Sequence, residues 1–249
     1  MNNVLNYYFI TGTSGGIGKA LATQLLKNTK NRVIGISRTN TISHPNYTHH
    51  AIDLSNLDLV ANFRFIPLES SKKVYLINNA GTLGSVKPIG KLQAIDIIKG
   101  YALNLIAPSV LTNSFINTYE NVEAEKVIVN ISSGAGKNPI DGWAIYCSSK
   151  AGIDLFSRVV ALEQEIQQQT NPLLKKFNIF SIAPGVVDTN MQVQIRNTEK
   201  ENFSRVADFI NYKTNNELSS PENVSKKYLQ LLADITTIKN IVSSIKDYD

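Results

Sequence analysis

The sequence is poor in the residues that build covalent or metal-based scaffolds. Its 249 residues include one cysteine, Cys147, and the three histidines are His44, His49 and His50. A single cysteine excludes a disulfide within the chain and a cysteine-based zinc site. No histidine is close to Cys147 in the sequence, so we interpret it as a half-buried thiol on a helix and not as a nucleophile. We predict no metal site.

Long apolar runs and runs of one charge are also missing. No stretch approaches the roughly 20 apolar residues that a membrane helix needs, and the start of the chain, which runs into VLNYYFITG, has neither a basic leader nor a small-residue cleavage site. The net charge is +5, but the lysines and arginines are dispersed and do not form a patch. We therefore expect a cytoplasmic protein that binds neither membranes nor nucleic acid.

Apolar segments rich in β-formers alternate with segments of helical period. The expected strands are residues 5–11, 32–37, 48–54, 73–81, 126–133 and 177–185, and the expected helices are residues 18–29, 91–119 and 144–169. This alternation predicts an α/β fold, a Rossmann-type doubly wound parallel sheet with helices on both faces, in a single domain over residues 1–249. The polar stretch 188–220 is either an inserted lid or a long loop.

A glycine turn, TGTSGGIG, follows the first strand and opens the first helix. Gly12 permits the tight turn, Gly16 allows the backbone to approach a pyrophosphate, and Gly18 lets helix and strand pack closely. The start of the helix adds free N–H groups and the positive end of its dipole. A glycine-rich turn without a ligand is the alternative, but the position between strand and helix favours a dinucleotide site.

The end of the second strand bears on which dinucleotide would bind. NAD-binding members of this fold place an acidic residue there to hold the ribose 2′-hydroxyl. This chain has Ser37 and Arg38 instead, which can hydrogen-bond to and pair with a 2′-phosphate. We predict NADP(H), with a solvated Arg38 as the alternative.

Tyr146 and Lys150 are four residues apart and share one face of a helix. A free tyrosine has a pKa near 10, and a nearby ammonium lowers the pKa of the phenol, which makes it a better proton donor at neutral pH. Ser133 lies thirteen residues upstream, at the predicted end of the fifth strand, where parallel sheets place ligands. A Tyr–Lys pair alone could be a helix surface, but the three residues together favour a catalytic site.

These features together resemble a classical short-chain dehydrogenase/reductase over nearly the whole chain. The glycine turn, Asp53–Leu54, NNAG at 78–81, the Ser–Tyr–Lys set and the PG at 184–185 follow the family's order. Asn104 matches the helix asparagine of the family's catalytic tetrad. The resemblance implies that Asn104 positions a water, that Ser133 orients a carbonyl oxygen and that Tyr146 protonates it.

The resemblance also implies which residues bind the cofactor. Lys150 would bind the nicotinamide ribose, and Pro184, Gly185 and Thr189 would supply the nicotinamide and phosphate contacts. The full set of implied cofactor contacts is Gly12, Ser14, Gly16, Ile17, Gly18, Ser37, Arg38, Asp53, Leu54, Asn79, Ala80, Gly81, Tyr146, Lys150, Pro184, Gly185, Val187 and Thr189.

The segment GWAIYCSSKAGIDLFSRVVALEQE is similar to sepiapterin reductases, and APGVVDTNMQVQIR is similar to these and to benzil reductases. Both groups reduce one carbonyl of a vicinal dicarbonyl or side-chain diketone. The resemblance thus implies an NADPH-dependent carbonyl reductase of a ketone or vicinal dicarbonyl, with a pterin as one candidate among several. Trp143 would form an aromatic wall of the pocket or belong to the core. Asp247 or Asp249 would anchor a pterin, or the acidic tail is simply solvated.

Other interpretations stay open at this stage. An NAD-dependent dehydrogenase of other alcohols, a non-catalytic NADP-sensing protein and a nucleic-acid binder with a Rossmann core share the fold. The short, weakly periodic segment after Asp53 leaves the extent of the second helix in doubt. The family resemblance implies a homodimer through the long helices, or a tetramer.

Overall fold

In the part of the chain that the structure describes, a single parallel sheet of seven strands forms the framework. The computed structural model describes residues 5–68 and 71–248. The strands are β1 (Leu5–Thr11), β2 (Asn31–Ser37), β3 (Tyr47–Ala51), β4 (Ser71–Asn78), β5 (Glu125–Ile131), β6 (Phe177–Ala183) and β7 (Val242–Ser244). They are paired in the order β3-β2-β1-β4-β5-β6-β7, and every pairing is parallel. This is the predicted doubly wound sheet, with the order reversing between β1 and β4.

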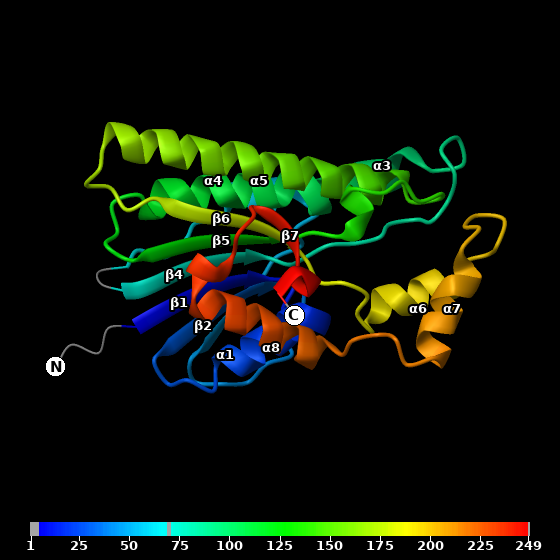
Figure 1. The fold of residues 1–249 in the computed structure, drawn as a ribbon, viewed down its shortest axis with the longest axis horizontal. Helices are drawn as coiled ribbons and strands as arrows, with labels where there is room; N and C mark the ends of the chain where they lie inside the picture. The colour runs from blue at the N-terminus through cyan, green and yellow to red at the C-terminus, as the bar shows by residue number, and fades with distance from the viewer. Residues whose placement is uncertain (1–4, 69–70, 249) are drawn as a thin grey trace.

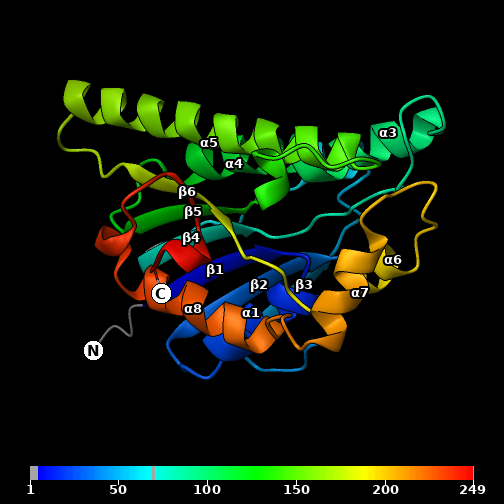
Figure 2. The ribbon, with the colours of Figure 1, turned by 45° about the vertical axis from the view of Figure 1, so that its right-hand side comes forward.

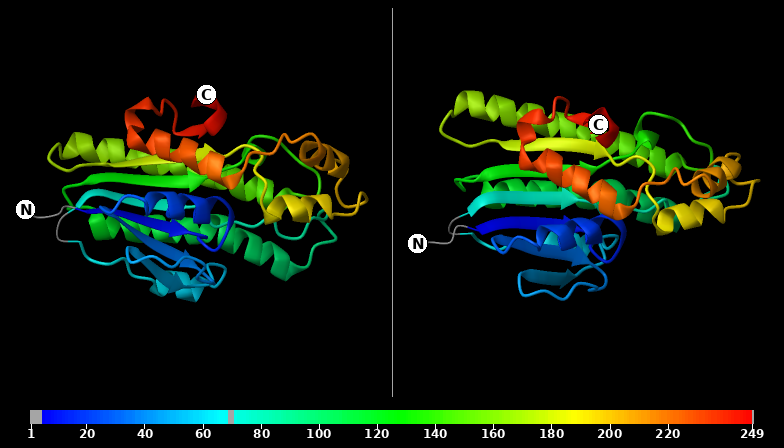
Figure 3. Two further views of the ribbon diagram at one scale, coloured as in Figure 1. Left: turned by 90° about the horizontal axis from the view of Figure 1, so that it is seen from below. Right: turned by 60° about the horizontal axis from the view of Figure 1, so that its bottom comes forward.

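Helices cover both faces of the sheet (Figure 1). They are α1 (Gly16–Leu25), α2 (Leu57–Asn62), α3 (Ala94–Tyr101), α4 (Ala107–Tyr119), α5 (Ala144–Thr170), α6 (Asn190–Arg196), α7 (Val206–Thr214) and α8 (Pro221–Ala233). Helices α4 and α5 lie on one face, and α1 and α8 lie side by side on the other (Figure 3). Helices α6 and α7 project beyond the ends towards which the strand arrows point (Figure 2).

Alternate residues of the strands pack into two hydrophobic cores, one on each face of the sheet. In β1, Tyr8 and Ile10 pack with α1 and α8, whereas Phe9 packs with Leu111 and Phe115 of α4. Burying one such side chain contributes about 1.5–3 kcal/mol to folding. Because both faces are covered, the strands are continuously apolar, which is what made them recognisable in the sequence.

The strands end earlier than predicted. β4 ends at Asn78, β5 at Ile131 and β6 at Ala183, so the segments 79–81, 132–133 and 184–189 are loops at the carboxyl edge, and a 3-10 turn, Gly134–Gly136, follows the second of them. Stretch 188–220 is not one long loop, since it contains α6 and α7. The second helix, α2, is six residues long, in keeping with the weak pattern in its segment.

One helix is more apolar than the sequence prediction allowed. The continuous helix Ala94–Tyr119 is long and apolar enough, by length and composition, to cross a membrane, with a mean hydropathy of 1.3 over its best window. The helices of soluble cores pass the same test. Here the α4 part of this helix packs its Leu111 and Phe115 side chains against the sheet. A π-helical turn, Ala102–Ile106, separates α3 from α4.

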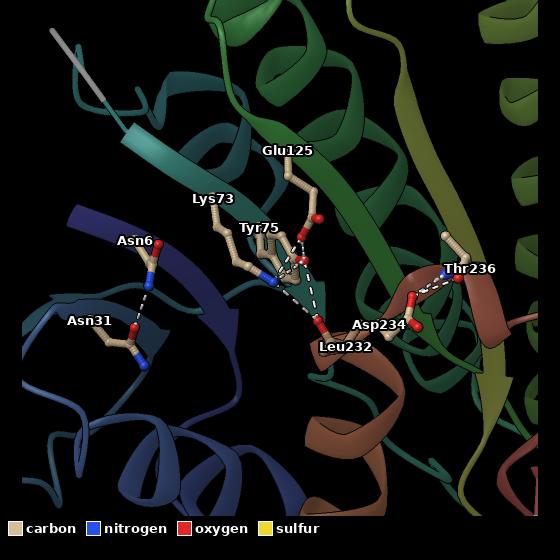
Figure 4. A network of polar contacts seen from close by, with 8 residues as sticks. All are labelled: Asn6, Asn31, Lys73, Tyr75, Glu125, Leu232, Asp234 and Thr236. Carbon is tan, nitrogen blue, oxygen red and sulfur yellow. Dashed lines mark hydrogen bonds and ion pairs between the residues drawn. The ribbon is translucent and has the colours of Figure 1, made fainter. Parts of the chain in front are cut away.

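The edge of the sheet opposite the loops is held by a polar network (Figure 4). Glu125 of β5 accepts a hydrogen bond from Tyr75 of β4 and pairs with Lys73 at 3.0 Å. The Tyr75 hydroxyl also lies 3.4 Å from the Leu232 carbonyl oxygen of α8. Burial, and then the Glu125 carboxylate, raise the pKa of Tyr75, so this phenol stays protonated and acts as a structural donor.

Candidate active site

A cleft of about 1390 Å³ opens at the carboxyl edge of the sheet. Most of the predicted site residues line it: Gly12, Ser14, Gly16, Ile17, Ser37, Arg38, Asp53, Leu54, Asn79, Ala80, Gly81, Ser133, Trp143, Tyr146, Lys150, Pro184, Gly185, Val187 and Thr189. Three predicted residues do not line it, namely Gly18, Asn104 and Asp247. The carboxyl ends of β1, β2, β4, β5 and β6 therefore bring together segments that are far apart in the sequence.

The glycine turn has the geometry of a backbone cradle. Gly12 and Gly16 have φ angles of +74° and +54°, which favour glycine. A Cβ on Gly12 would lie 2.9 Å from the Asn79 amide nitrogen, and one on Gly18 would collide with the Gly12 carbonyl oxygen. Gly18 thus acts behind the cleft, in the close packing predicted for it. The Gly15 position is open, so the start of α1 is free to receive a pyrophosphate.

The predicted 2′-phosphate site lies at the end of β2. Arg38 is exposed and lines the cleft, close enough to Asp53 to help lower the pKa of that carboxyl, although hydrogen bonds from Ser55 contribute most. Ser37 is buried, and its hydroxyl donates to the Thr39 carbonyl oxygen at 3.0 Å. Of the two predicted residues, Arg38 is therefore the one with a free charged group, whereas the Ser37 hydroxyl is already hydrogen-bonded within the protein.

Tyr146, Lys150 and Ser133 meet on the wall of the cleft. Helix α5 presents Tyr146 and Lys150 one turn apart, both less than 8% exposed. Ser133 follows β5 and is a hydrogen-bond partner of the Tyr146 phenol. The Lys150 ammonium lies 5.7 Å from the centre of the Tyr146 ring and donates to the Ile131 carbonyl oxygen at 2.7 Å.

The pKa of Tyr146 differs from the sequence prediction. Burial raises it above the ordinary value, and the Ser133 hydroxyl opposes this rise. Burial also lowers the pKa of Lys150 to about 8, while Asp154 acts in the opposite direction. The net direction for Tyr146 is therefore a raised pKa, with burial as the largest cause, where the sequence predicted a lowered one.

Asn104 lies behind the cleft, in the π-helical turn. Its side chain accepts from the Thr82 N–H and donates to the Thr82 carbonyl oxygen, each at 2.8 Å. A Cβ on Gly81 would lie 3.4 Å from the Asn104 amide oxygen and 3.7 Å from the Lys150 ammonium nitrogen. Asn104 thus fixes the loop after β4 beside Lys150, and π-helical turns of this kind recur at functional sites.

Trp143 belongs both to the cleft and to a satellite core. Its ring lies 5.7 Å from that of Tyr146, 5.3 Å from Phe203 and 5.6 Å from Phe209. Phe209, on α7, also lines the cleft. Trp143 is thus part of an aromatic cluster that packs α7 against α5, and it also lines the cleft next to the phenol.

The prediction of a carboxylate anchor at the tail is not supported by the geometry. Asp247 accepts a hydrogen bond from the Ser244 N–H at 2.8 Å and does not line the cleft. The alternative residue, Asp249, lies outside the described residues. Lys246 reaches the cleft instead, beside Gly185, so the tail contributes a cation where we expected an anion.

Sequence reasoning missed several residues that line the cleft. Phe209, Gln192 and Asp154 come from α7, α6 and α5. Only Asp154 had a signal in the sequence, because it continues the four-residue spacing of Tyr146 and Lys150. Within residues 5–68 and 71–248, no group of three or more His, Cys, Asp and Glu side chains is placed to hold a metal ion.

Comparisons with known proteins agree with this geometry. Residues 6–200 match the short chain dehydrogenase family model. The benzil reductase ((S)-benzoin forming) of Bacillus cereus is 41% identical over 241 residues, which cover 92% of this chain and 94% of that protein. The sepiapterin reductase of Mus musculus is 29% identical over 215 residues, covering 77% and 78%. The crystal structure of the KRED1-Pglu enzyme superposes with a TM-score of 0.75 at 26% identity, covering 92% and 95%.

Proposed function

The chain belongs to the short chain dehydrogenase family, and we propose that it is an NADPH-dependent reductase of vicinal dicarbonyl compounds. As a member it is an oxidoreductase that acts on carbonyl or alcohol groups with a nicotinamide cofactor. The observation that carries the proposal is the convergence of Ser133, Tyr146 and Lys150 on a cleft that begins at a glycine turn.

In this proposal the protein supplies position and protons. The Ser133 hydroxyl holds the substrate carbonyl oxygen beside the Tyr146 phenol, which donates its proton to that oxygen. Burial keeps the phenol protonated at neutral pH, so the donor form is the populated one. The Lys150 ammonium places positive charge beside the phenol and favours the phenolate that remains after the transfer.

The cofactor residues fit a dinucleotide phosphate. When bound, NADPH would supply the hydride, which is chemistry that belongs to the cofactor. The open backbone at Gly15 would receive the pyrophosphate, and Arg38 would pair with the 2′-phosphate. Asp53, held by Ser55, would contact the adenine.

The substrate end of the cleft favours a carbonyl flanked by an aromatic group. Trp143 and Phe209 form an apolar wall next to Tyr146, and aromatic walls bind aryl rings by stacked or edge contacts. The benzil reductase relative covers nearly the whole chain, so a diaryl dicarbonyl is the substrate class we favour. The absence of Asp247 from the cleft disfavours a pterin held by that carboxylate.

Turnover of matched carbonyl compounds tests the function directly. We expect the purified protein to oxidise NADPH rapidly with benzil, more slowly with sepiapterin and weakly with a simple monoketone, and to use NADH poorly in each case. Cofactor consumption followed by absorbance is the measurement. A protein that binds NADPH but reduces none of the three would support the non-catalytic alternative and overturn the reductase proposal.

The outer face of α5 carries an apolar stripe that suits a second copy of the chain. Leu155, Val159, Leu162 and Ile166 are 46–61% exposed and follow the i, i+4, i+7 spacing of a helix seam. We propose a homodimer through this face, as the family resemblance implies, with a tetramer as the larger possibility. A cytoplasmic location stays a prediction from the sequence.

Charges in this stripe should separate the subunits. We expect the double variant Leu155→Glu/Leu162→Glu to sediment as a 27.5 kDa monomer, because buried carboxylates would face one another across the seam. Leu173→Glu is the control, since Leu173 is 88% exposed and lies after the end of α5. Wild-type protein that sediments as a monomer would remove the proposal.

A further inference from the structure

A buried carboxylate lies one helical turn beyond Lys150. Asp154 is 7% exposed and continues the spacing of Tyr146 and Lys150 along α5. Its Oδ1 accepts hydrogen bonds from the hydroxyls of Ser132, after β5, and Ser181, on β6, each at 2.6 Å. The carboxylate therefore ties the catalytic helix to two neighbouring strands.

The backbone around Asp154 is packed to fit it. A Cβ on Gly136 would lie 3.0 Å from Asp154 Oδ2 and 3.0 Å from the Lys150 carbonyl carbon. The loop that carries Ser133 thus rests directly on this turn of α5, and glycine is required for the close approach.

Lys150 has few charged neighbours. Among the residues that the structure describes, Asp154 is the charged group that acts on it. The groups that face Lys150 from other elements are polar or apolar but carry no charge: the Ile131 carbonyl of β5, Gly81 after β4 and Asn104 of the π-helical turn. On α5 itself, the titratable neighbours are Tyr146 and, next to it, Cys147.

We propose that Asp154 is a positioning residue of the active site, the buried counter-charge that keeps Lys150 an ammonium while its two serine bonds hold α5 in register with β5 and β6. This inference rests on the proposed reductase function, because it assigns a part in proton donation to Lys150. An ammonium buried without a counter-charge loses its proton readily. Asp154 acts through Lys150 and does not itself meet the substrate.

The direction in which the Asp154 charge changes the pH dependence of activity follows from the Lys150 pKa. Burial brings that pKa down to about 8, and the Asp154 carboxylate holds it from falling further. The ammonium is present below this pKa and is lost as the pH rises through it. Removing the Asp154 charge lowers the Lys150 pKa, so the alkaline loss of activity should begin at a lower pH.

The pH profile of benzil reduction with NADPH tests the role of the Asp154 charge separately from the role of its two hydrogen bonds to serine. Asp154→Asn keeps an oxygen for both serines but loses the charge, and we expect the alkaline limb of kcat to move down by about one pH unit. Ser181→Ala keeps the Asp154 charge but removes one of the hydrogen bonds to it. We therefore expect kcat to fall while the alkaline limb of its pH profile stays at the same pH. Glu163→Gln, an exposed carboxylate on the same helix, should change neither. An unmoved limb in Asp154→Asn would reduce Asp154 to a structural role.

A double-mutant cycle of unfolding stability tests the interaction between Asp154 and Lys150 without an activity assay. Asp154→Asn should lower the urea midpoint strongly when Lys150 is present and much less in a Lys150→Met background, because the cost is that of an unpaired buried ammonium. If Asp154→Asn alone does not fold, Lys150→Met/Asp154→Asn should recover folding. Equal losses in both backgrounds, or failure of the double variant to fold, would overturn the inference. A wild-type protein inactive on every carbonyl would overturn the reductase proposal and leave this cycle to decide the pairing.

Discussion

Tyr146→Phe should reduce the turnover of benzil by NADPH by about 10³-fold, within the 10²–10⁴ range of general acid catalysis. The variant removes one hydroxyl and leaves the aromatic ring in contact with Trp143. The substrate oxygen would still meet Ser133 but would have no positioned proton donor. Steady-state kinetics with saturating NADPH measures the loss.

Cofactor binding separates this chemical defect from a damaged site. The glycine turn, Arg38 and Lys150 are untouched in Tyr146→Phe, so the Kd for NADPH, measured by fluorescence titration, should stay within about two-fold, a change well below 1.4 kcal/mol. Tyr101→Phe is the matched control, because the Tyr101 hydroxyl bonds to Ser148 on the same helix α5 but lies outside the cleft. Normal turnover in Tyr146→Phe would exclude this tyrosine as the acid.

The parts of the site that were predicted from the residues themselves are fixed by local spacing, whereas Asn104 and the contacts at 184–189 were implied by the family resemblance. The glycine turn follows β1, and Tyr146 and Lys150 are one helical turn apart, so neither inference needed a tertiary contact. The rule that ligands bind at the carboxyl edge of a parallel sheet then placed Ser133 beside them. The same local reasoning predicted the strands, whose apolar runs mark burial on both faces.

What the sequence could not show depends on contacts between distant segments. Helices α6 and α7 are seven and nine residues long, and helices this short are stabilised by packing more than by propensity. Phe203 and Phe209 supply that packing when they meet Trp143, which a polar, broken stretch of sequence does not reveal. Asp247 does not line the cleft for a related reason, since its side chain accepts a hydrogen bond from the nearby backbone of Ser244.

The pKa of Tyr146 illustrates how burial changes a local argument. The four-residue spacing to Lys150 predicted a lowered pKa, but burial of the phenol raises it. Burial also lowers the pKa of Lys150 to about 8, so desolvation shifts the pKa values of both residues. In the proposed mechanism, the working state at neutral pH is a neutral phenol beside an ammonium that the Asp154 charge supports.

Arg38→Asp should reverse the cofactor preference. The wild-type guanidinium is exposed at the end of β2 and would pair with the 2′-phosphate of NADPH, a charged interaction of about 1.5–3 kcal/mol. The carboxylate of the variant would repel that phosphate and offer an acceptor to the free 2′-hydroxyl of NADH. We expect the lost pairing alone to lower the NADPH-to-NADH ratio of kcat/KM by about 10- to 10²-fold, since each 1.4 kcal/mol is a factor of ten, and the repulsion to lower it further.

The reversal should arise from the site and not from the change in net charge. Lys30→Asp makes the same two-unit change at an exposed position before the opposite end of β2, so its cofactor ratio should stay near the wild-type value. Salt should weaken the NADPH preference of the wild type, because Arg38 is exposed and its field is screened within about 8–10 Å at physiological ionic strength. Ser37 should matter less than Arg38, since its hydroxyl is bound to Thr39. An unchanged ratio in Arg38→Asp would exclude Arg38 as the 2′-phosphate contact and would point to another cation of the cleft, such as Lys19 or Lys99.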